Sequence, residues 1–372
     1  MNKMIFEIDS GLQAVHARKK DWEVLYKDSE SSNPFLSWEW NYYWASNYST
    51  PKNIRILIGK LGGVVNCIVP LQMEGSKMAF LRDHEYADYG GLLVSKNLSC
   101  NHLKTIIDRI MHESHRLSFE AIRSDSLEFD LIESLVDSKR IQPVVTYMCD
   151  NPYVAKNDDF DNYYATRSKK LRQEIRTTEN NLRRMGEYNF VEEVKGDNYE
   201  KLLDKLAEFH LKRQIEKIGG SILGSKKALE FFKDAPSHLK SSSCQLHMSA
   251  IVLNDQVISA ALSIQTNSTL YYWIPSFETD IPKVSLGKLH IKLLIEKCHN
   301  QNMAFDFMGG DEKYKYQWAD SSLSVMKYMF FTSDCAKMIY KTGECMKNLL
   351  KNKVSNSHFI RKTRVAISNY YR

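Results

Sequence analysis

The sequence predicts an α/β protein that contains two copies of one unit and a helical tail. Its 372 residues are enough for two domains. In both halves, short strand-like segments alternate with helical ones. Each half also has a polar, aromatic loop that contains a glycine pair, residues 83–91 in the first half and 309–318 in the second. We place the domains at 1–150 and 151–334, and the tail at 335–372.

The first half is expected to begin with a short strand and a helix that ends near residue 26. The segments expected to follow are a helix at 34–48, strands at 54–60, 64–72, 77–81 and 92–94, a helix at 101–117 and a strand at 118–122. The helix at 34–48 is rich in aromatic residues, and Trp40 shares a face with Tyr43 and Trp44. These rings belong either to the core or to a groove for an acceptor.

The second half is expected to follow a polar link near residues 150–161. Its predicted elements are a basic helix at 167–184, a strand at 188–194, a helix at 199–218, strands at 246–253, 257–265 and 269–277, a helix at 285–300 and strands at 303–308 and 325–332. The basic face of the first helix is either solvated or in contact with a phosphate-bearing acceptor or CoA.

The start of the helix at 285–300 is a candidate anion site. It opens with Ser285, Leu286, Gly287 and Lys288. The serine is a plausible N-cap, and a helix N-terminus with small residues and a lysine favours an anion. Because the helix lies between two strands that could splay apart, we expect the ligand to enter between them.

Asp306 is an acid within an otherwise apolar strand. Such a carboxylate is costly unless it is paired or used in chemistry. Two interpretations stay open: Asp306 caps a turn or pairs with Lys313 or Lys315, or it is a catalytic base. His210 and Arg213 share one side of a helix, which suits a ligand site, although a single histidine is more often structural.

Composition and motifs exclude several classes of protein. No segment approaches the roughly 20 apolar residues of a membrane-spanning helix, and the N-terminus lacks a signal-peptide core. The seven cysteines show no spacing typical of disulfides or zinc, so we expect a cytoplasmic protein without a metal. The sequence has no phosphate-binding P-loop, dinucleotide fingerprint or nucleophile elbow.

The positive charge of the chain is concentrated in its tail. The net charge is +6, and residues 336–372 hold nine Lys or Arg against one acid, Glu344. The same segment has enough apolar residues for an amphipathic face. We expect it either to dock on the second domain or to lie on anionic lipid at the inner membrane face.

Taken in order, these motifs resemble the acyltransferase domain of the GNAT superfamily, in the CelD-like branch of bacterial polysaccharide biosynthesis. That branch is similar to the Fem-type aminoacyltransferases. The resemblance rests on the segments 209–213, 257–262, 285–287 and 305–315, with 33–40 and 88–94 in the first half. It implies two tandem GNAT-like domains, each a mixed, mainly antiparallel sheet flanked by helices.

The resemblance also implies transfer of an acyl group from acyl-CoA, most simply acetyl-CoA, to an amine. An amino sugar used in cell-surface polysaccharide synthesis is the expected acceptor. Such a reaction needs a pyrophosphate site, a donor to the oxyanion and a base. We assign the pyrophosphate to the loop and helix start from Lys283 to Lys288, and the oxyanion to backbone N–H groups between Trp273 and Phe277. The residues expected to contact the cofactor are Trp273, Ile274, Ser285, Leu286, Gly287 and Lys288.

The base and the acceptor site are assigned on the same resemblance. Asp306 is the first candidate for the base, with Glu278 and His210 as alternatives. Tyr314 or Tyr272 would return a proton to the thiolate. The residues expected to contact the acceptor are Arg213, Lys315, Asp88, Tyr89 and Trp40.

Two other functions stay open. A Fem-type enzyme would use aminoacyl-tRNA as donor, and the basic tail and basic helix would suit RNA. The sequence shows no coiled-coil arm of the kind such proteins often carry, so we do not expect a nucleic-acid partner. The third option is a non-catalytic assembly protein that binds a membrane surface through its tail. The sequence does not predict the oligomeric state.

Overall fold

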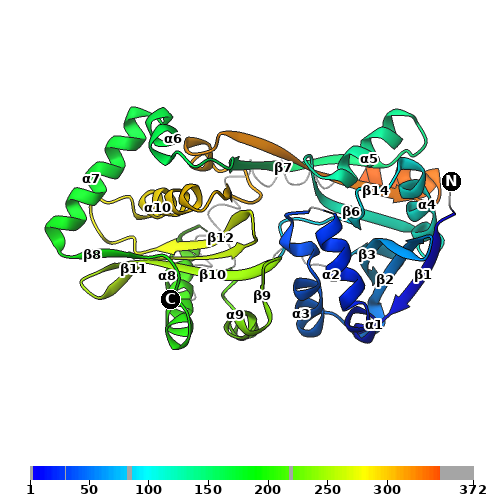
Figure 1. The fold of residues 1–372 in the computed structure, drawn as a ribbon, viewed down its shortest axis with the longest axis horizontal. Coiled ribbons are helices and arrows are strands. Elements are labelled where there is room, and N and C mark those ends of the chain that lie inside the picture. The colour runs from blue at the N-terminus through cyan, green and yellow to red at the C-terminus, as the bar shows by residue number, and fades with distance from the viewer. Residues whose placement is uncertain (1–2, 30, 82–85, 218–220, 344–372) are drawn as a thin grey trace, which may run out of the picture.

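A computed structural model describes residues 3–29, 31–81, 86–217 and 221–343. The chain forms an elongated molecule of two lobes, with the first half in blue and cyan and the second in green and yellow (Figure 1). Two long strands, β7 (Val144–Val154) and β14 (Ser321–Phe331), run along the top of the view from one lobe to the other. The halves are therefore joined by paired strands.

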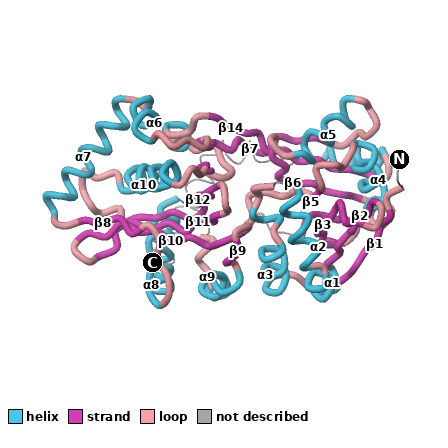
Figure 2. Tube along the Cα trace, viewed as in Figure 1, coloured by secondary structure: helices cyan, strands magenta, loops and turns pink. Residues whose placement is uncertain are grey.

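One continuous mixed sheet runs through both lobes. Its strand order is β1-β2-β3-β4-β6-β14-β7-β13-β12-β11-β10-β8, and nearly all neighbours are antiparallel (Figure 2). The parallel pairs are β4 with β6 and β12 with β13. β14 lies near the end of the second half in the chain, yet it pairs with β6 of the first half as well as with β7.

The first half contains most of the blue and cyan elements. Its strands are β1 (Ile5–Ser10), β2 (Ile54–Leu61), β3 (Val64–Glu74), β4 (Lys77–Phe80), β5 (Leu93–Val94) and β6 (Arg116–Arg123). Its helices are α1 (Leu12–Ala17), α2 (Lys19–Asp28), α3 (Trp38–Tyr48), α4 (Cys100–Met111) and α5 (Leu127–Asp137). Serine side chains cap the last three helices, from Ser37, Ser99 and Ser126.

The second half repeats the pattern of strands and covering helices. Its strands are β8 (Tyr188–Val191), β9 (Lys240–Ser241), β10 (Cys244–Leu253), β11 (Gln256–Gln265), β12 (Thr269–Phe277) and β13 (Ala304–Asp306). Its helices are α6 (Phe160–Thr166), α7 (Lys169–Met185), α8 (Asp197–Lys217), α9 (Lys226–His238) and α10 (Leu286–Asn300). Together the halves confirm the predicted fold class, two units of mixed, mainly antiparallel sheet flanked by helices.

Three apolar clusters hold the molecule together. The largest combines residues of α2 and α3 with residues of α8, α9 and the β10–β12 meander, so both halves share it. The second lies beneath α4 and α5, and the third beneath α7 and α10. A shared core and a shared sheet mean that the halves fold against each other rather than independently.

Several elements differ from the sequence prediction. α5, α9 and β7 were not predicted, and the expected polar link near 150–161 begins within β7. The proposed domain boundaries remain predictions, and β7 spans the first of them. Residues 334–343 are helical, whereas the rest of the predicted tail, 344–372, lies outside the described residues. None of the described helices is both long and apolar enough to span a bilayer.

Candidate active site

Strands β12 and β13 separate in the middle of the second half. β12 pairs with β13 only through Thr269, Leu270 and Tyr271, and β13 ends at Asp306. β12 continues to Phe277, and no described strand pairs with this edge beyond Tyr271. The predicted splay is confirmed, and it leaves backbone N–H and C=O groups of β12 available to a ligand.

A β-bulge falls on β12 where the strands separate. Leu262 of β11 pairs with Ile274 and Ser263 pairs with Tyr272, so Trp273 is the extra residue. The bulge places the Trp273 and Ile274 side chains in the core shared by both halves. The predicted role of their backbone N–H groups does not depend on these side chains and stays a prediction.

A cavity of about 390 Å³ lies between the free edge of β12 and the start of α10. It is lined by Arg213, Tyr272, Pro275, Phe277, Val284, Ser285, Leu286, Gly287, Lys288, Ile291 and Tyr314. The structure therefore brings together the whole predicted anion segment, Arg213 and Tyr314. Sequence analysis missed the apolar wall, because the bulge on β12 changes which side chains face α10.

The first turn of α10 is open toward the cavity. Ser285 is the N-cap, but its side chain makes no capping hydrogen bond, and its own N–H donates to the Thr178 hydroxyl at 2.9 Å. The next N–H groups have no partner inside the helix, as at any helix start. Lys288 forms an ion pair with Glu174 of α7, so its charge is partly balanced. The anion site thus rests on backbone N–H groups more than on the lysine.

The ring of Phe277 leaves no room for a side chain at Gly287. A Cβ atom added to Gly287 would lie 2.6 Å from Cε1 of that ring, closer than atoms can pack. A neighbouring side chain therefore excludes a Cβ at this position even without a bound phosphate. The guanidinium of Arg213 stacks on the same ring at 4.3 Å, and no described acid pairs with it.

Two tyrosines, Tyr272 and Tyr314, line the cavity. Burial raises the pKa of Tyr314 to about 12, and it raises the pKa of Tyr272 well above its usual value. Both side chains therefore stay protonated near neutral pH. Neither hydroxyl has a hydrogen-bond partner in the described part of the chain, so each can donate to a ligand.

Asp306 lies at the junction of the halves, outside the cavity lining. Its carboxylate accepts hydrogen bonds from Tyr89 at 2.8 Å, Arg123 at 3.1 Å, Asn151 at 3.2 Å and the Met308 N–H at 2.7 Å. It is 2% exposed. The Met308 N–H bond confirms the interpretation that Asp306 caps a turn. The alternative pairing with Lys313 or Lys315 is wrong, because Arg123 of the first half is the partner. The predicted base is therefore surrounded by donors and held away from the cavity.

Lys315 and Asp88 hold the Gly309–Gly310 loop from two sides. Lys315, 4% exposed, donates to the Gly309 carbonyl at 2.8 Å and pairs with Glu312 at 2.9 Å. Asp88 accepts from the Gly309 N–H at 3.0 Å. Neither lines the cavity beside α10, and their contact with an acceptor stays a prediction.

The remaining predicted residues lie elsewhere. Trp40 is 1% exposed and packs on Phe35 and Trp273, which confirms the interpretation as core. His210 shares a hydrogen bond with the Ser221 hydroxyl at 2.7 Å. Glu278 pairs with Lys212 at 2.9 Å. None of the three lines the cavity.

A protein-family model matches most of the second half. Residues 169–316 match the family model described as an acetyltransferase (GNAT) domain. No curated protein matches the chain. The matched segment contains β12, β13, α10 and every residue that lines the cavity.

Solved structures share the fold over most of the chain. FemX is 9% identical over 86% of this chain and 98% of its own, with a TM-score of 0.58. A protein of unknown function from Bacteroides thetaiotaomicron is 14% identical over 88% of this chain and 99% of its own, with a TM-score of 0.57. The C-terminal domain of a putative lysylphosphatidylglycerol synthetase from Agrobacterium fabrum is 10% identical over 88% of this chain and 96% of its own, with a TM-score of 0.54. Residues 169–316 therefore resemble a GNAT acetyltransferase domain, and the whole chain is similar in fold to FemX.

Proposed function

We propose that this protein is an N-acyltransferase that takes its acyl group from a CoA thioester held between β12 and α10. One observation carries the proposal: one cavity is surrounded by a strand edge and an arginine that have no partner strand and no acid partner among the described residues, and by a helix start without a side-chain cap. Acyl transfer as the reaction class follows from the GNAT domain.

The cavity suits a donor with an anionic end and an apolar arm. Arg213 and the N–H groups at the start of α10 offer positive charge for a pyrophosphate. Pro275, Phe277 and Ile291 provide apolar wall along the free edge of β12. When bound, the donor supplies an activated acyl group.

The chain itself would supply an oxyanion donor and a general acid. Free N–H groups on the edge of β12 stabilise the oxyanion, and Tyr314, held protonated, donates a proton to the leaving sulfur. No acid or histidine among the described residues lines the cavity. We therefore propose that the amine proton leaves through water rather than through Asp306.

The acceptor and pathway are proposed on the resemblance to CelD-like proteins. An amine, with an amino sugar of cell-surface polysaccharide synthesis as the first candidate, would enter from the junction of the two halves. We further propose that the enzyme acts in the cytoplasm, with the basic tail reaching the inner membrane face. The described start of that tail, with Met338 and Ile339 each 69% exposed, supports an apolar contact.

A second candidate is transfer from aminoacyl-tRNA. It is favoured by the outer face of α7, which exposes Lys169, Lys170, Arg172, Arg176, Arg183 and Arg184. Calorimetry with acetyl-CoA and a gel shift with total tRNA separate the two. Binding of acetyl-CoA without a tRNA shift supports the CoA donor; a salt-sensitive tRNA shift without acetyl-CoA binding would replace it.

A further inference from the structure

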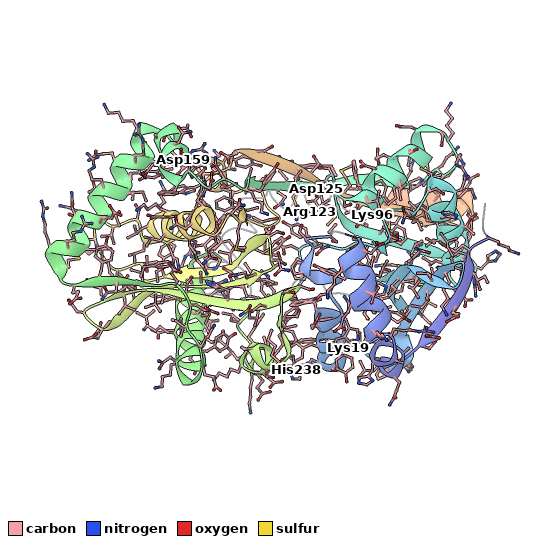
Figure 3. The ribbon with its side chains drawn as sticks, viewed as in Figure 1. Lys19, Lys96, Arg123, Asp125, Asp159 and His238 are labelled. Atoms are coloured by element: carbon pink, nitrogen blue, oxygen red, sulfur yellow. The ribbon has the colours of Figure 1, made fainter. Side chains whose placement is uncertain are left out.

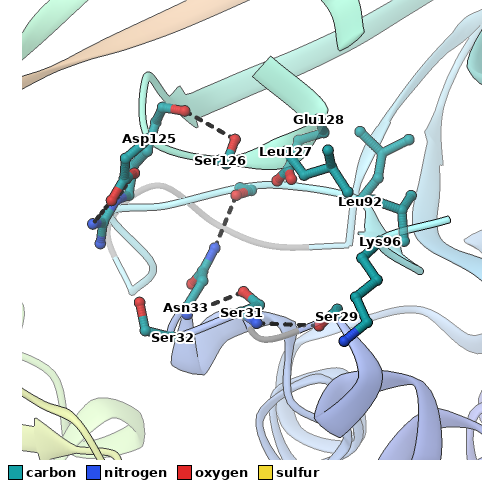
Figure 4. A pocket seen from close by; sticks show the side chains of 13 residues that line it. Ser29, Ser31, Ser32, Asn33, Leu92, Lys96, Asp125, Ser126, Leu127 and Glu128 are labelled. Carbon is teal, nitrogen blue, oxygen red and sulfur yellow. Dashed lines mark hydrogen bonds and ion pairs between the residues drawn. The ribbon is translucent and has the colours of Figure 1, made fainter. Parts of the chain in front are cut away.

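A second cavity of about 390 Å³ lies wholly in the first half (Figure 4). Its walls are the loop after α2, the segment around β5, the end of β6 and the first turn of α5. The residues that matter here are Ser29, Asn33, Lys96, Arg123, Asp125 and Glu128. It shares no lining residue with the cavity beside α10.

Glu128 is a buried acid in this wall. It is 6% exposed, and no lysine, arginine or histidine of the described chain forms an ion pair with it. Burial raises the pKa of its carboxyl group to about 7. Hydrogen bonds from its own backbone N–H, from the Ser126 side chain and from the Leu92 N–H oppose the rise, and the charge of Asp125 adds to it. The Cys67 thiol, on β3, is also close enough to sense the charge of Glu128.

The positive charges near Glu128 are already engaged. Arg123 lies 2.6 Å from Asp125 and 3.1 Å from Asp306, so two carboxylates balance its guanidinium. Lys96 takes part in an interaction of its own. Figure 3 shows Lys96, Arg123 and Asp125 where the first lobe meets the second. The ionised Glu128 is therefore met by hydrogen-bond donors, its own N–H, the Leu92 N–H and the Ser126 side chain, but no described cation forms an ion pair with it.

We propose that this cavity binds a small primary ammonium compound bearing hydroxyl groups, with Glu128 as its counter-ion. A buried carboxylate gains most from a charged donor, because a charge-assisted hydrogen bond compensates its lost hydration. Serine hydroxyls and the Asn33 amide lie around it and can bond to ligand hydroxyls. The cavity is of the size that small ligands occupy. The site is separate from acyl transfer, and its test requires no acyl donor.

The test compares serinol with glycerol, which has a hydroxyl in place of the ammonium. Binding to the full chain is measured by saturation-transfer NMR and calorimetry. Serinol should bind and glycerol should not. Between about pH 6 and pH 8 the affinity for serinol should rise about tenfold, because the ionised fraction of a carboxyl with a pKa of about 7 rises by that factor. Calorimetry in two buffers should show that binding near pH 7 releases protons.

Two variants of α5 complete the test. Glu128→Gln keeps the shape of the side chain and should abolish serinol binding and its pH dependence. Asp130→Asn makes the same charge change at an exposed position of the same helix and should bind as the wild type does. Equal binding of serinol and glycerol, pH-independent binding without proton release, or unchanged affinity in Glu128→Gln would each overturn the proposal. The pH and proton-release measurements need only the wild-type protein.

Discussion

The guanidinium of Arg123 lies 3.1 Å from the carboxylate of Asp306, and this buried ion pair joins the two halves of the chain. Arg123 ends β6 and Asp306 ends β13, 183 residues later in the sequence. Tyr89 and Asn151 donate to the same carboxylate. Asp306, which the sequence suggests as a catalytic base, thus holds the end of β13 in place. Beyond this point β12 has no described partner strand on that side.

Asp306→Asn should destabilise the protein. The substitution removes the charge that compensates Arg123 inside the protein, and breaking a buried pair in this way costs about 3 kcal/mol. Urea unfolding measures the loss. Asp311→Asn, at an exposed position of the next loop, should leave stability unchanged. A stable Asp306→Asn variant that binds donor normally but has no activity would restore the base assignment.

Gly287→Ala should weaken donor binding and stability together. The new methyl group would force the Phe277 ring to move, and overpacking of this kind costs roughly 1–3 kcal/mol. The displaced ring also borders the cavity, so calorimetry with acetyl-CoA should show reduced affinity. Gly343→Ala, where a Cβ meets open space, is the control. Unchanged acetyl-CoA affinity in Gly287→Ala would place the donor elsewhere.

Tyr314→Phe should lower kcat while leaving acetyl-CoA affinity intact. Loss of a general acid costs roughly 10²–10⁴-fold in rate. Because the pKa of Tyr314 is raised to about 12, the hydroxyl is protonated below that pH, and wild-type activity should show no loss from its ionisation up to about pH 10. Thiol release from acetyl-CoA, with glucosamine heading a panel of amines, measures the rate. Tyr316→Phe, at an exposed position, is the control, and equal rates in both variants would exclude Tyr314.

Glu128 should make the protein less stable as pH rises. Its pKa is raised from an ordinary 4.5 to about 7 in the folded state, so between these values the folded state holds the proton more tightly. The free energy of unfolding should therefore fall by roughly 3 kcal/mol in total as the pH rises between these two pKa values. Glu128→Gln should remove that part of the pH dependence, seen as the difference between the two unfolding curves. Parallel curves for wild type and variant would show that Glu128 ionises freely.

Much of the second half could be predicted from local pattern. The apolar spacing from residue 289 onward predicts a helix at 285–300, and the structure has α10 at Leu286–Asn300. The aromatic strand at 269–277 coincides with β12. Serine, glycine and leucine at a helix start between two strands were enough to locate the cavity, because that signal depends only on neighbouring residues.

The errors lie where distant segments decide the structure. The bulge at Trp273 turns two successive side chains to one face, which strict alternation cannot predict. Arg123 pairs with Asp306 only because β14 and β7 bring the halves together. α5 did carry a local signal, since Ser126 precedes apolar residues at Leu131, Ile132 and Leu135 in helical spacing.

The measurement that tests the central claim most directly is calorimetric titration of acetyl-CoA into the wild type and Arg213→Ala. Arg213 lines the cavity without a described acid partner, so it is free to bind a phosphate. Lys201→Ala removes the same charge from an exposed position of α8 and serves as the control. We predict that wild type and Lys201→Ala bind alike and that Arg213→Ala binds roughly tenfold more weakly or worse. Absence of binding to the wild type, or equal affinity in all three proteins, would contradict a CoA site between β12 and α10.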